Sequence, residues 1–159
     1  HAARRVVFAG FVTGIICSLI GSQIMLQGDG YEDAAVALRI AVGSGIAFLT
    51  AQLVDVFIFD RMRQGVWWRA PLASSVVGSA LDTALFFTIA FSASITLFPA
   101  SANEEISWAW DAVPLMNFGA PYPLWVSLAI ADWMVKMTLA LIALIPFRIA
   151  VGKILQPSA

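Results

Sequence analysis

Residues 121–148 read PYPLWVSLAIADWMVKMTLALIALIPFR, an apolar stretch that is long enough to cross a bilayer and yet holds Asp132 and Lys136 near its middle. A hydrocarbon core about 30 Å thick needs about 20 helical residues, and each charge at its centre costs roughly 2.5 to 3.5 kcal/mol. A second such stretch, residues 71–98 (PLASSVVGSALDTALFFTIAFSASITLF), holds Asp82. Charges kept at that depth face a partner or a polar cavity. The two stretches therefore predict a membrane protein with a functional interior, and transport is the first class to consider.

Two further apolar stretches, residues 5–26 and 34–59, complete a set of four predicted spans. The 159 residues are 60% hydrophobic and only 12% charged, and the apolar residues form long runs without the alternation of a membrane strand. We therefore predict an all-α integral membrane protein. It is expected to be a polytopic helix bundle with four transmembrane helices, in a single transmembrane domain over residues 1–159.

The distribution of charge predicts an orientation. Seven of the nine basic residues flank the spans on one side: Arg4, Arg5, Arg61, Arg63, Arg69, Arg148 and Lys153. The connectors on the other side carry only acidic charge: Asp29, Glu32, Asp33, Glu104, Glu105 and Asp111. By the positive-inside rule, we predict that both ends of this chain and the connector 60–69 are cytoplasmic. The tryptophans near the span ends are typical of an interfacial belt: Trp67 and Trp68 inside, and Trp108, Trp110 and Trp125 outside.

Small residues predict where helices pack closely. Gly10, Gly14, Ser18 and Ser22 recur every four residues in the first span. Pairs in the second and third spans suggest the same role: Gly43 with Ala47, and Ser74 with Gly78. The serines near Asp82 could also donate hydrogen bonds to its carboxylate.

Six polar or charged side chains are expected inside the bundle: Arg39, Gln52, Asp55, Asp82, Asp132 and Lys136. Asp132 and Lys136 are four positions apart, so we expect them to form an ion pair on one helix face. Asp82 has no basic neighbour on its own face and needs Arg39 or Lys136 from another helix, a proton or a ligand. We favour a substrate site lined by this set over a purely structural role. The alternatives for two members are that Arg39 extends to the outer surface and that Asp55 anchors the inner interface.

Enzymatic and metal-binding classes are disfavoured. Cys17 and His1 are the only residues of their types, which excludes a cysteine cluster and a histidine-based nucleophile or metal site. Asp82 and Asp132 lack the glycine-flanked motif of intramembrane aspartyl proteases, and no glycine-rich phosphate loop follows a strand. We predict no enzymatic activity, no cofactor and no nucleic-acid partner.

Several segments, taken together and in order, resemble the VUT family of bacterial queuosine precursor transporters: HAARRVVFAGF (1–11), QLVD (52–55), FDRMRQ (59–64), WWRAP (67–71), SALDTALFF (79–87) and ADWMVK (131–136). The resemblance covers nearly the whole chain. It implies import of a 7-deazaguanine such as preQ0 or preQ1 across the bacterial inner membrane. It also implies a six-helix fold similar to the substrate-binding subunits of energy-coupling-factor transporters, with about two N-terminal helices that we expect this chain to lack.

The side chains suit such a substrate. A guanine-like edge presents adjacent N–H donors that a carboxylate can accept in a bidentate way. Asp82 or Asp132 could do this, Gln52 could bind the exocyclic carbonyl, and Trp133 or a phenylalanine of residues 71–98 could stack on the ring. An aminomethyl substituent would bring a cation for the other carboxylate. The candidate substrate-binding residues are Asp82, Asp132, Lys136, Gln52, Arg39, Asp55 and Trp133.

Two other functions stay open from the sequence. One is a substrate-capture subunit that needs a separate energising module, and the other is a non-transporting membrane scaffold. The expected partners are a small purine-like substrate and the lipid bilayer. We also expect four helices to leave the polar groove incomplete, so that upstream helices or a second copy, hence a homo-oligomer, would cover it.

Overall fold

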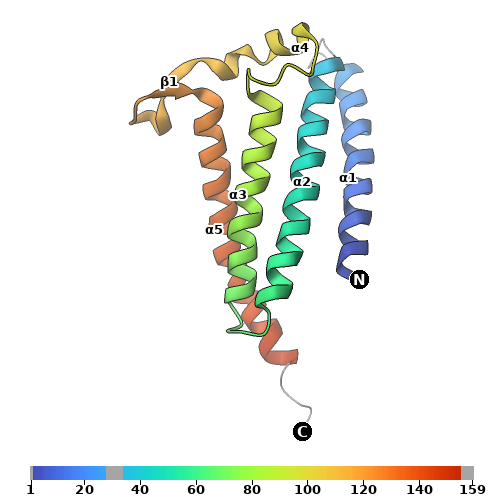
Figure 1. The fold of residues 1–159 in the computed structure, drawn as a ribbon, viewed down its shortest axis with the longest axis vertical. Coiled ribbons are helices and arrows are strands. Elements are labelled where there is room, and N and C mark those ends of the chain that lie inside the picture. Colours follow the sequence, from blue (N-terminus) through green and yellow to red (C-terminus); the bar gives the residue numbers. More distant parts are fainter. Residues whose placement is uncertain (1, 28–33, 155–159) are drawn as a thin grey trace.

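The computed structural model of the chain describes residues 2–27 and 34–154. Four long helices lie side by side and run roughly along one direction (Figure 1): α1 (Ala2–Gln27), α2 (Ala34–Met62), α3 (Arg69–Phe91) and α5 (Leu124–Ile154). Helix α2 packs against α3 on one side and α1 on the other, and α5 packs against α3. The spatial order is therefore α5, α3, α2, α1, with α3 and α2 at the centre.

The length and composition of these helices confirm the predicted all-α polytopic membrane class. Within the described residues, three helical stretches are long and apolar enough to cross a membrane: Leu38–Met62, Arg69–Phe91 and Leu124–Ile149. The continuous apolar stretch described in α1, Arg5–Cys17, is shorter. A crossing by α1 therefore stays a prediction.

Helix α3 ends at Phe91, seven residues before the predicted end of its span, and Ser92 is already extended with φ −72° and ψ 131°. Side chains from elsewhere take the carbonyls that a longer helix would have used. Arg39 donates to the carbonyls of Ile89 (2.9 Å) and Ser92 (2.6 Å). The indole N–H of Trp110 donates to the carbonyl of Phe91 (2.7 Å). The helix stops because its last carbonyls are satisfied by these donors, a tertiary effect that the apolar sequence after Phe91 does not reveal.

The connector between α3 and α5 folds into a cap. It contains five short elements: α4 (Ala100–Glu105), the 3-10 turns η1 (Ser107–Trp110) and η2 (Leu115–Asn117), and the strands β1 (Ala112–Pro114) and β2 (Pro121–Pro123). The two strands pair antiparallel, with Val113 opposite Tyr122. Ala102 and Ile106 of the cap are buried and pack against apolar side chains that include Ile40 and Phe98. The cap thus closes one end of the α2–α3 pair (Figure 1).

Small residues bring α2 and α3 close together, as predicted. A Cβ on Gly43 would lie 3.4 Å from the backbone nitrogen of Ala90, and a Cβ on Gly78 would lie 3.6 Å from the carbonyl oxygen of Ala51. Ala47 and Ser74 are buried in the same bundle.

The small residues that were predicted to pack closely in the first span behave differently. A Cβ on Gly14 would meet no atom of the described residues within 4 Å, and one on Gly10 would only just reach the ring of Phe48. The side chains of Ser18 and Ser22 lie outside the described residues. The closer contact instead uses a small residue of α2, because Phe11 and Ile15 of α1 lie against Gly45.

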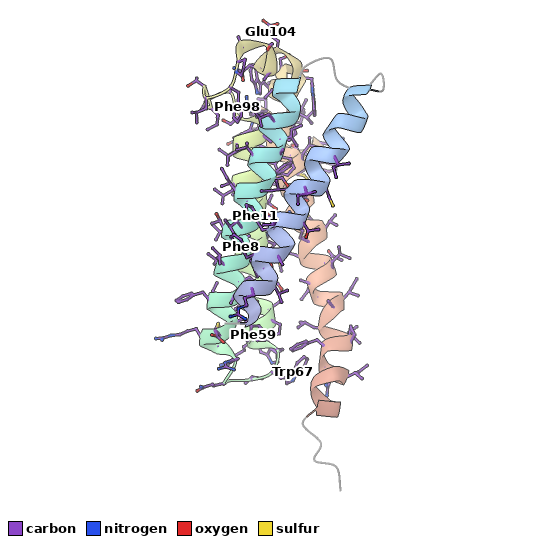
Figure 2. All side chains as sticks on the ribbon, turned by 90° about the vertical axis from the view of Figure 1, so that its right-hand side faces the viewer. Phe8, Phe11, Phe59, Trp67, Phe98 and Glu104 are labelled. Carbon is purple, nitrogen blue, oxygen red and sulfur yellow. The ribbon has the colours of Figure 1, made fainter. Side chains whose placement is uncertain are left out.

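Charge separates along the bundle as the sequence predicted. The start of α1, the α2–α3 connector and the end of α5 lie at one end, and the cap lies at the other (Figure 1). Trp67 marks the first end and Glu104 the second (Figure 2). The acidic residues of the first connector, Asp29, Glu32 and Asp33, lie outside the described residues.

Candidate functional site

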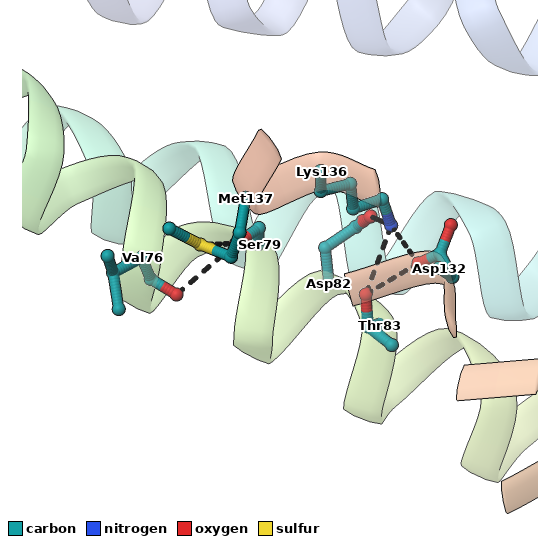
Figure 3. Close-up of polar contacts among 7 residues, drawn as sticks. All are labelled: Val76, Ser79, Asp82, Thr83, Asp132, Lys136 and Met137. Carbon is teal, nitrogen blue, oxygen red and sulfur yellow. Dashed lines mark hydrogen bonds and ion pairs between the residues drawn. The ribbon is translucent and has the colours of Figure 1, made fainter. Parts of the chain in front are cut away.

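Three charged side chains meet between α3 and α5 (Figure 3). The Nζ of Lys136 lies 2.7 Å from Asp82 Oδ2 and 2.6 Å from Asp132 Oδ2. Thr83 completes the group: its hydroxyl accepts from Lys136 (3.1 Å) and donates to Asp132 (2.6 Å). The expected pair of Asp132 and Lys136 is confirmed, and Lys136 is also the partner that Asp82 needed from another helix. We call Asp82, Thr83, Asp132 and Lys136 the interhelical cluster.

The chemistry of the cluster limits what it can offer a ligand. An ammonium group has three N–H donors, and Lys136 directs them at three different acceptors. No donor is left over, whereas each carboxylate keeps a second oxygen. About a third of the side-chain surface is exposed in Lys136 (33%), Asp82 (31%) and Asp132 (34%). The cluster is therefore a partly open acceptor site that carries one net negative charge.

An open groove of about 460 Å³ lies beside the cluster. That volume is within the usual range for small-molecule sites. Its lining comes from three helices: Phe48, Ala51, Gln52 and Asp55 of α2; Ser75, Gly78, Ser79 and Asp82 of α3; and Lys136, Leu139, Ala140 and Ala143 of α5. The walls are largely apolar, and the polar groups converge from different helices.

Gln52 and Asp55 form the wall of the groove that belongs to α2. They are three positions apart, so both lie on the same helix face. Gly78 makes room for this wall, because a Cβ there would lie 3.5 Å from the Cβ of Asp55 and 3.6 Å from its Oδ1. Within residues 34–154, neither Gln52 nor Asp55 has a side-chain hydrogen bond or ion pair.

For the alternative role of Asp55 as an anchor at the inner interface, the described residues provide no partner. At that end Asp60 pairs with Arg63 at 3.2 Å, and both side chains are mostly exposed.

Arg39 lies apart from the groove, at the capped end of α3. It is fully buried, with 0% of its surface exposed. Besides its two backbone partners, it donates to the side-chain oxygen of Asn103 and lies 5.5 Å from the ring centre of Phe98. The alternative in which Arg39 extends to the outer surface is wrong, because the cap folds over it. Its charge instead compensates the negative end of α3.

Trp133 is half-buried, and its indole N–H is buried without a hydrogen-bond partner among the described residues. It is not among the residues that line the groove.

The hydrogen bonds that the sequence allowed from the serines of α3 to Asp82 are not formed. Ser79 and Ser74 donate to carbonyls of their own helix, those of Val76 and Pro71, and not to Asp82. Thr83 is the hydroxyl that joins the cluster. A residue directly after Asp82 points to a different part of the helix surface, so only the position of α5 reveals its role. Within the described residues, no group of three His, Cys, Asp or Glu side chains could hold a metal ion.

Comparison with known proteins adds a family. The profile of a family described as "Putative vitamin uptake transporter" matches residues 1–151. A queuosine precursor transporter of Escherichia coli K12 is 37% identical over 66% of this chain and 51% of its own length. A probable queuosine precursor transporter of Haemophilus influenzae is 29% identical over 91% of this chain and 55% of its own. The chain thus spans about half the length of these two relatives, and no solved structure matches it.

Proposed function

The chain belongs to the vitamin uptake transporter family, and from that premise we propose that it takes part in importing a queuosine precursor, a 7-deazaguanine such as preQ0 or preQ1. The proposal draws on two similar proteins that carry the name of queuosine precursor transporters. The observation that carries it is the groove of about 460 Å³, where Gln52 and Asp55 face apolar walls without protein partners among the described residues. Polar groups kept free at membrane depth favour a ligand that satisfies them. We infer transport and not catalysis.

The groove suits the hydrogen-bonding edge of a guanine-like ring. Adjacent N–H donors can pair with one carboxylate in a bidentate way, and an amide N–H can donate to the exocyclic carbonyl. Asp55 and Gln52 offer these two groups on one helix face. The free oxygen of Asp82 supplies a further acceptor in the groove, and Asp132, which is not among the lining residues, acts through its contact with Lys136.

The charge balance favours a donor-rich solute. Asp55, Asp82 and Asp132 carry three negative charges against the single positive charge of Lys136. A cationic substituent, such as the aminomethyl group of preQ1, would offset part of this excess.

We further propose that the chain lies in the bacterial inner membrane with both ends and the α2–α3 connector in the cytoplasm. The support is the basic charge at that end of the bundle, which the positive-inside rule assigns to the cytoplasm. In a Cys17→Ser background, a cysteine at Gln64 should resist an impermeant thiol reagent in intact cells, while one at Ser101 should react. Labelling of Gln64→Cys from outside would refute the proposed orientation and indicate the opposite one.

The open side of the groove suggests that more protein completes it. Carboxylates that faced acyl chains would carry the cost of a charge in the membrane. We propose that further helices or a second copy of the chain cover this side, and that the bilayer and the purine-like solute are the other partners. No nucleic acid is expected.

Binding measured on purified protein tests the proposal. Asp55→Asn turns one acceptor oxygen into a donor that faces a donor, so affinity for preQ1 or preQ0 should fall about 10- to 150-fold, the equivalent of one charge-assisted contact of about 1.5–3 kcal/mol. Asp82→Asn and Asp132→Asn should also weaken binding. Asp60→Asn is the matched control, because Asp60 lies on the same helix outside the groove.

Uptake into a strain that lacks its own precursor transport gives the functional readout, with expression from the complete gene. Unchanged affinity in stable variants of Asp55, Asp82 and Asp132 would refute the assignment of the groove. Absence of any precursor binding or uptake would refute the proposed function.

A further inference from the structure

Two tryptophan–arginine pairs lie at the end of the bundle opposite the cap. The guanidinium carbon of Arg148 on α5 lies 5.8 Å from the ring centre of Trp67, and that of Arg69 lies 5.8 Å from the ring of Trp68. An open cleft of about 520 Å³ adjoins the first pair. Its lining is Trp67, Leu144, Ile145, Arg148 and Ile149. We propose that this cleft binds an anionic phospholipid, with its phosphate on Arg148 and an acyl chain along α5.

The charges at this end favour an anion. The nearby carboxylate of Asp60 is already paired with Arg63. Within residues 34–154, Arg61, Arg69 and Arg148 have no ion pair. A guanidinium that stacks on an aromatic face keeps its N–H edge free, and that edge matches two phosphate oxygens. Trp67 therefore keeps the Arg148 guanidinium beside the cleft, where its N–H groups can reach a phosphate.

The walls of the cleft favour a lipid over a free phosphate ion. Ile145 and Ile149 are 66% and 57% exposed, and they continue the apolar surface of α5 up to Arg148. Arginine at the end of an apolar helix and tryptophan beside it mark the depth of the phospholipid headgroups. Basic pockets between helices at this depth bind anionic headgroups. An acyl chain would cover the isoleucines while its phosphate reaches the guanidinium.

Lipid retention by the purified protein tests the proposal. Native mass spectrometry would count phosphatidylglycerol and phosphatidylcholine molecules that stay bound, and thermal unfolding would be measured in parallel with each lipid. We expect phosphatidylglycerol to be retained and to raise the unfolding temperature, and phosphatidylcholine to do neither. Arg148→Gln should weaken retention about fivefold, the effect of one basic residue near an anionic surface. Inorganic phosphate should give no protection.

The matched control is Arg63→Gln, which removes the same charge at the same end from a residue already paired with Asp60. It should leave retention unchanged. Arg148→Lys keeps the charge but loses the two-pronged contact, and it covers the case in which Arg148→Gln fails to fold.

Three results would overturn the proposal. They are equal loss in Arg148→Gln and Arg63→Gln, equal retention of the two lipids, and protection by phosphate alone. A fourth would assign the cleft to a protein interface: disulfide crosslinking of Ile145→Cys between copies, with the same efficiency in either lipid. None of these outcomes bears on precursor binding in the groove.

Discussion

Replacing Lys136 with methionine should destabilise the bundle, because one ammonium joins two carboxylates on different helices. The variant leaves Asp82 and Asp132 facing each other without a cation, after losing contacts of 2.7 and 2.6 Å. Removing one partner of a buried ion pair costs about 3–5 kcal/mol. Since about a third of each side chain is exposed, we take the lower end, about 3 kcal/mol. For a chain of 159 residues this corresponds to a fall of about 6–12 °C in unfolding temperature.

Second-site changes make the prediction specific to this geometry. In the Lys136→Met background, Asp132 still accepts a hydrogen bond from Thr83 at 2.6 Å, whereas Asp82 has lost its cation. Asp82→Asn should therefore restore more stability than Asp132→Asn. If Lys136 were paired with Asp132 alone, replacing both by leucine would suffice. The structure predicts that this double variant stays destabilised until Asp82 is also replaced.

Thermal unfolding of detergent-purified variants measures these differences, with Arg63→Met as the control. Arg63 and Asp60 are 61% and 72% exposed, so breaking their pair should cost less than about 1 kcal/mol. An unchanged unfolding temperature in Lys136→Met would refute the role of the cluster in stability. Greater rescue by Asp132→Asn than by Asp82→Asn would refute the assigned contacts.

Other predictions concern the cap and the groove. Arg39→Lys should lower the free energy of unfolding by about 2–3 kcal/mol, because a single ammonium cannot reproduce the guanidinium contacts to the end of α3 and to the cap. Thermal unfolding measures this loss, and an unchanged unfolding temperature would contradict the capping role. Trp110→Phe keeps the ring but removes the donor to the carbonyl of Phe91, so a loss of about 1 kcal/mol is expected in the same assay, and no loss would count against that bond. Gly78→Val should abolish precursor binding by filling the space beside Asp55, whereas Gly14→Val, which has no atom within 4 Å of its Cβ, should leave binding intact; equal affinities would argue against the groove.

Local sequence features predicted the helices and the pairing within one helix. Apolar length alone places a helix in a bilayer, so the long helices and their class followed from composition. The pair of Asp132 and Lys136 followed from a spacing of four residues, which one helix enforces without help from its neighbours.

The contacts between helices needed the tertiary structure. Sequence placed Asp82 inside the membrane but left its partner open between Arg39, Lys136, a proton and a ligand. The answer depends on how α3 and α5 are rotated about their axes, and apolar residues all around a helix leave that rotation open. The same holds for Thr83, and for Gln52 and Asp55, which share a groove with Lys136 because α2 and α5 both flank α3.

The end of α3 shows most clearly which features the sequence determines and which the fold determines. The amino-acid sequence determined that residues 71–98 are apolar enough for a span, and hydropathy gave no reason to stop at Phe91. Only the fold decided the boundary, because Arg39 and Trp110 come from distant parts of the chain to bond its last carbonyls. Partition into the membrane acts on each segment separately and can be read from its composition, whereas a hydrogen bond between segments exists only once both have been brought to the same place.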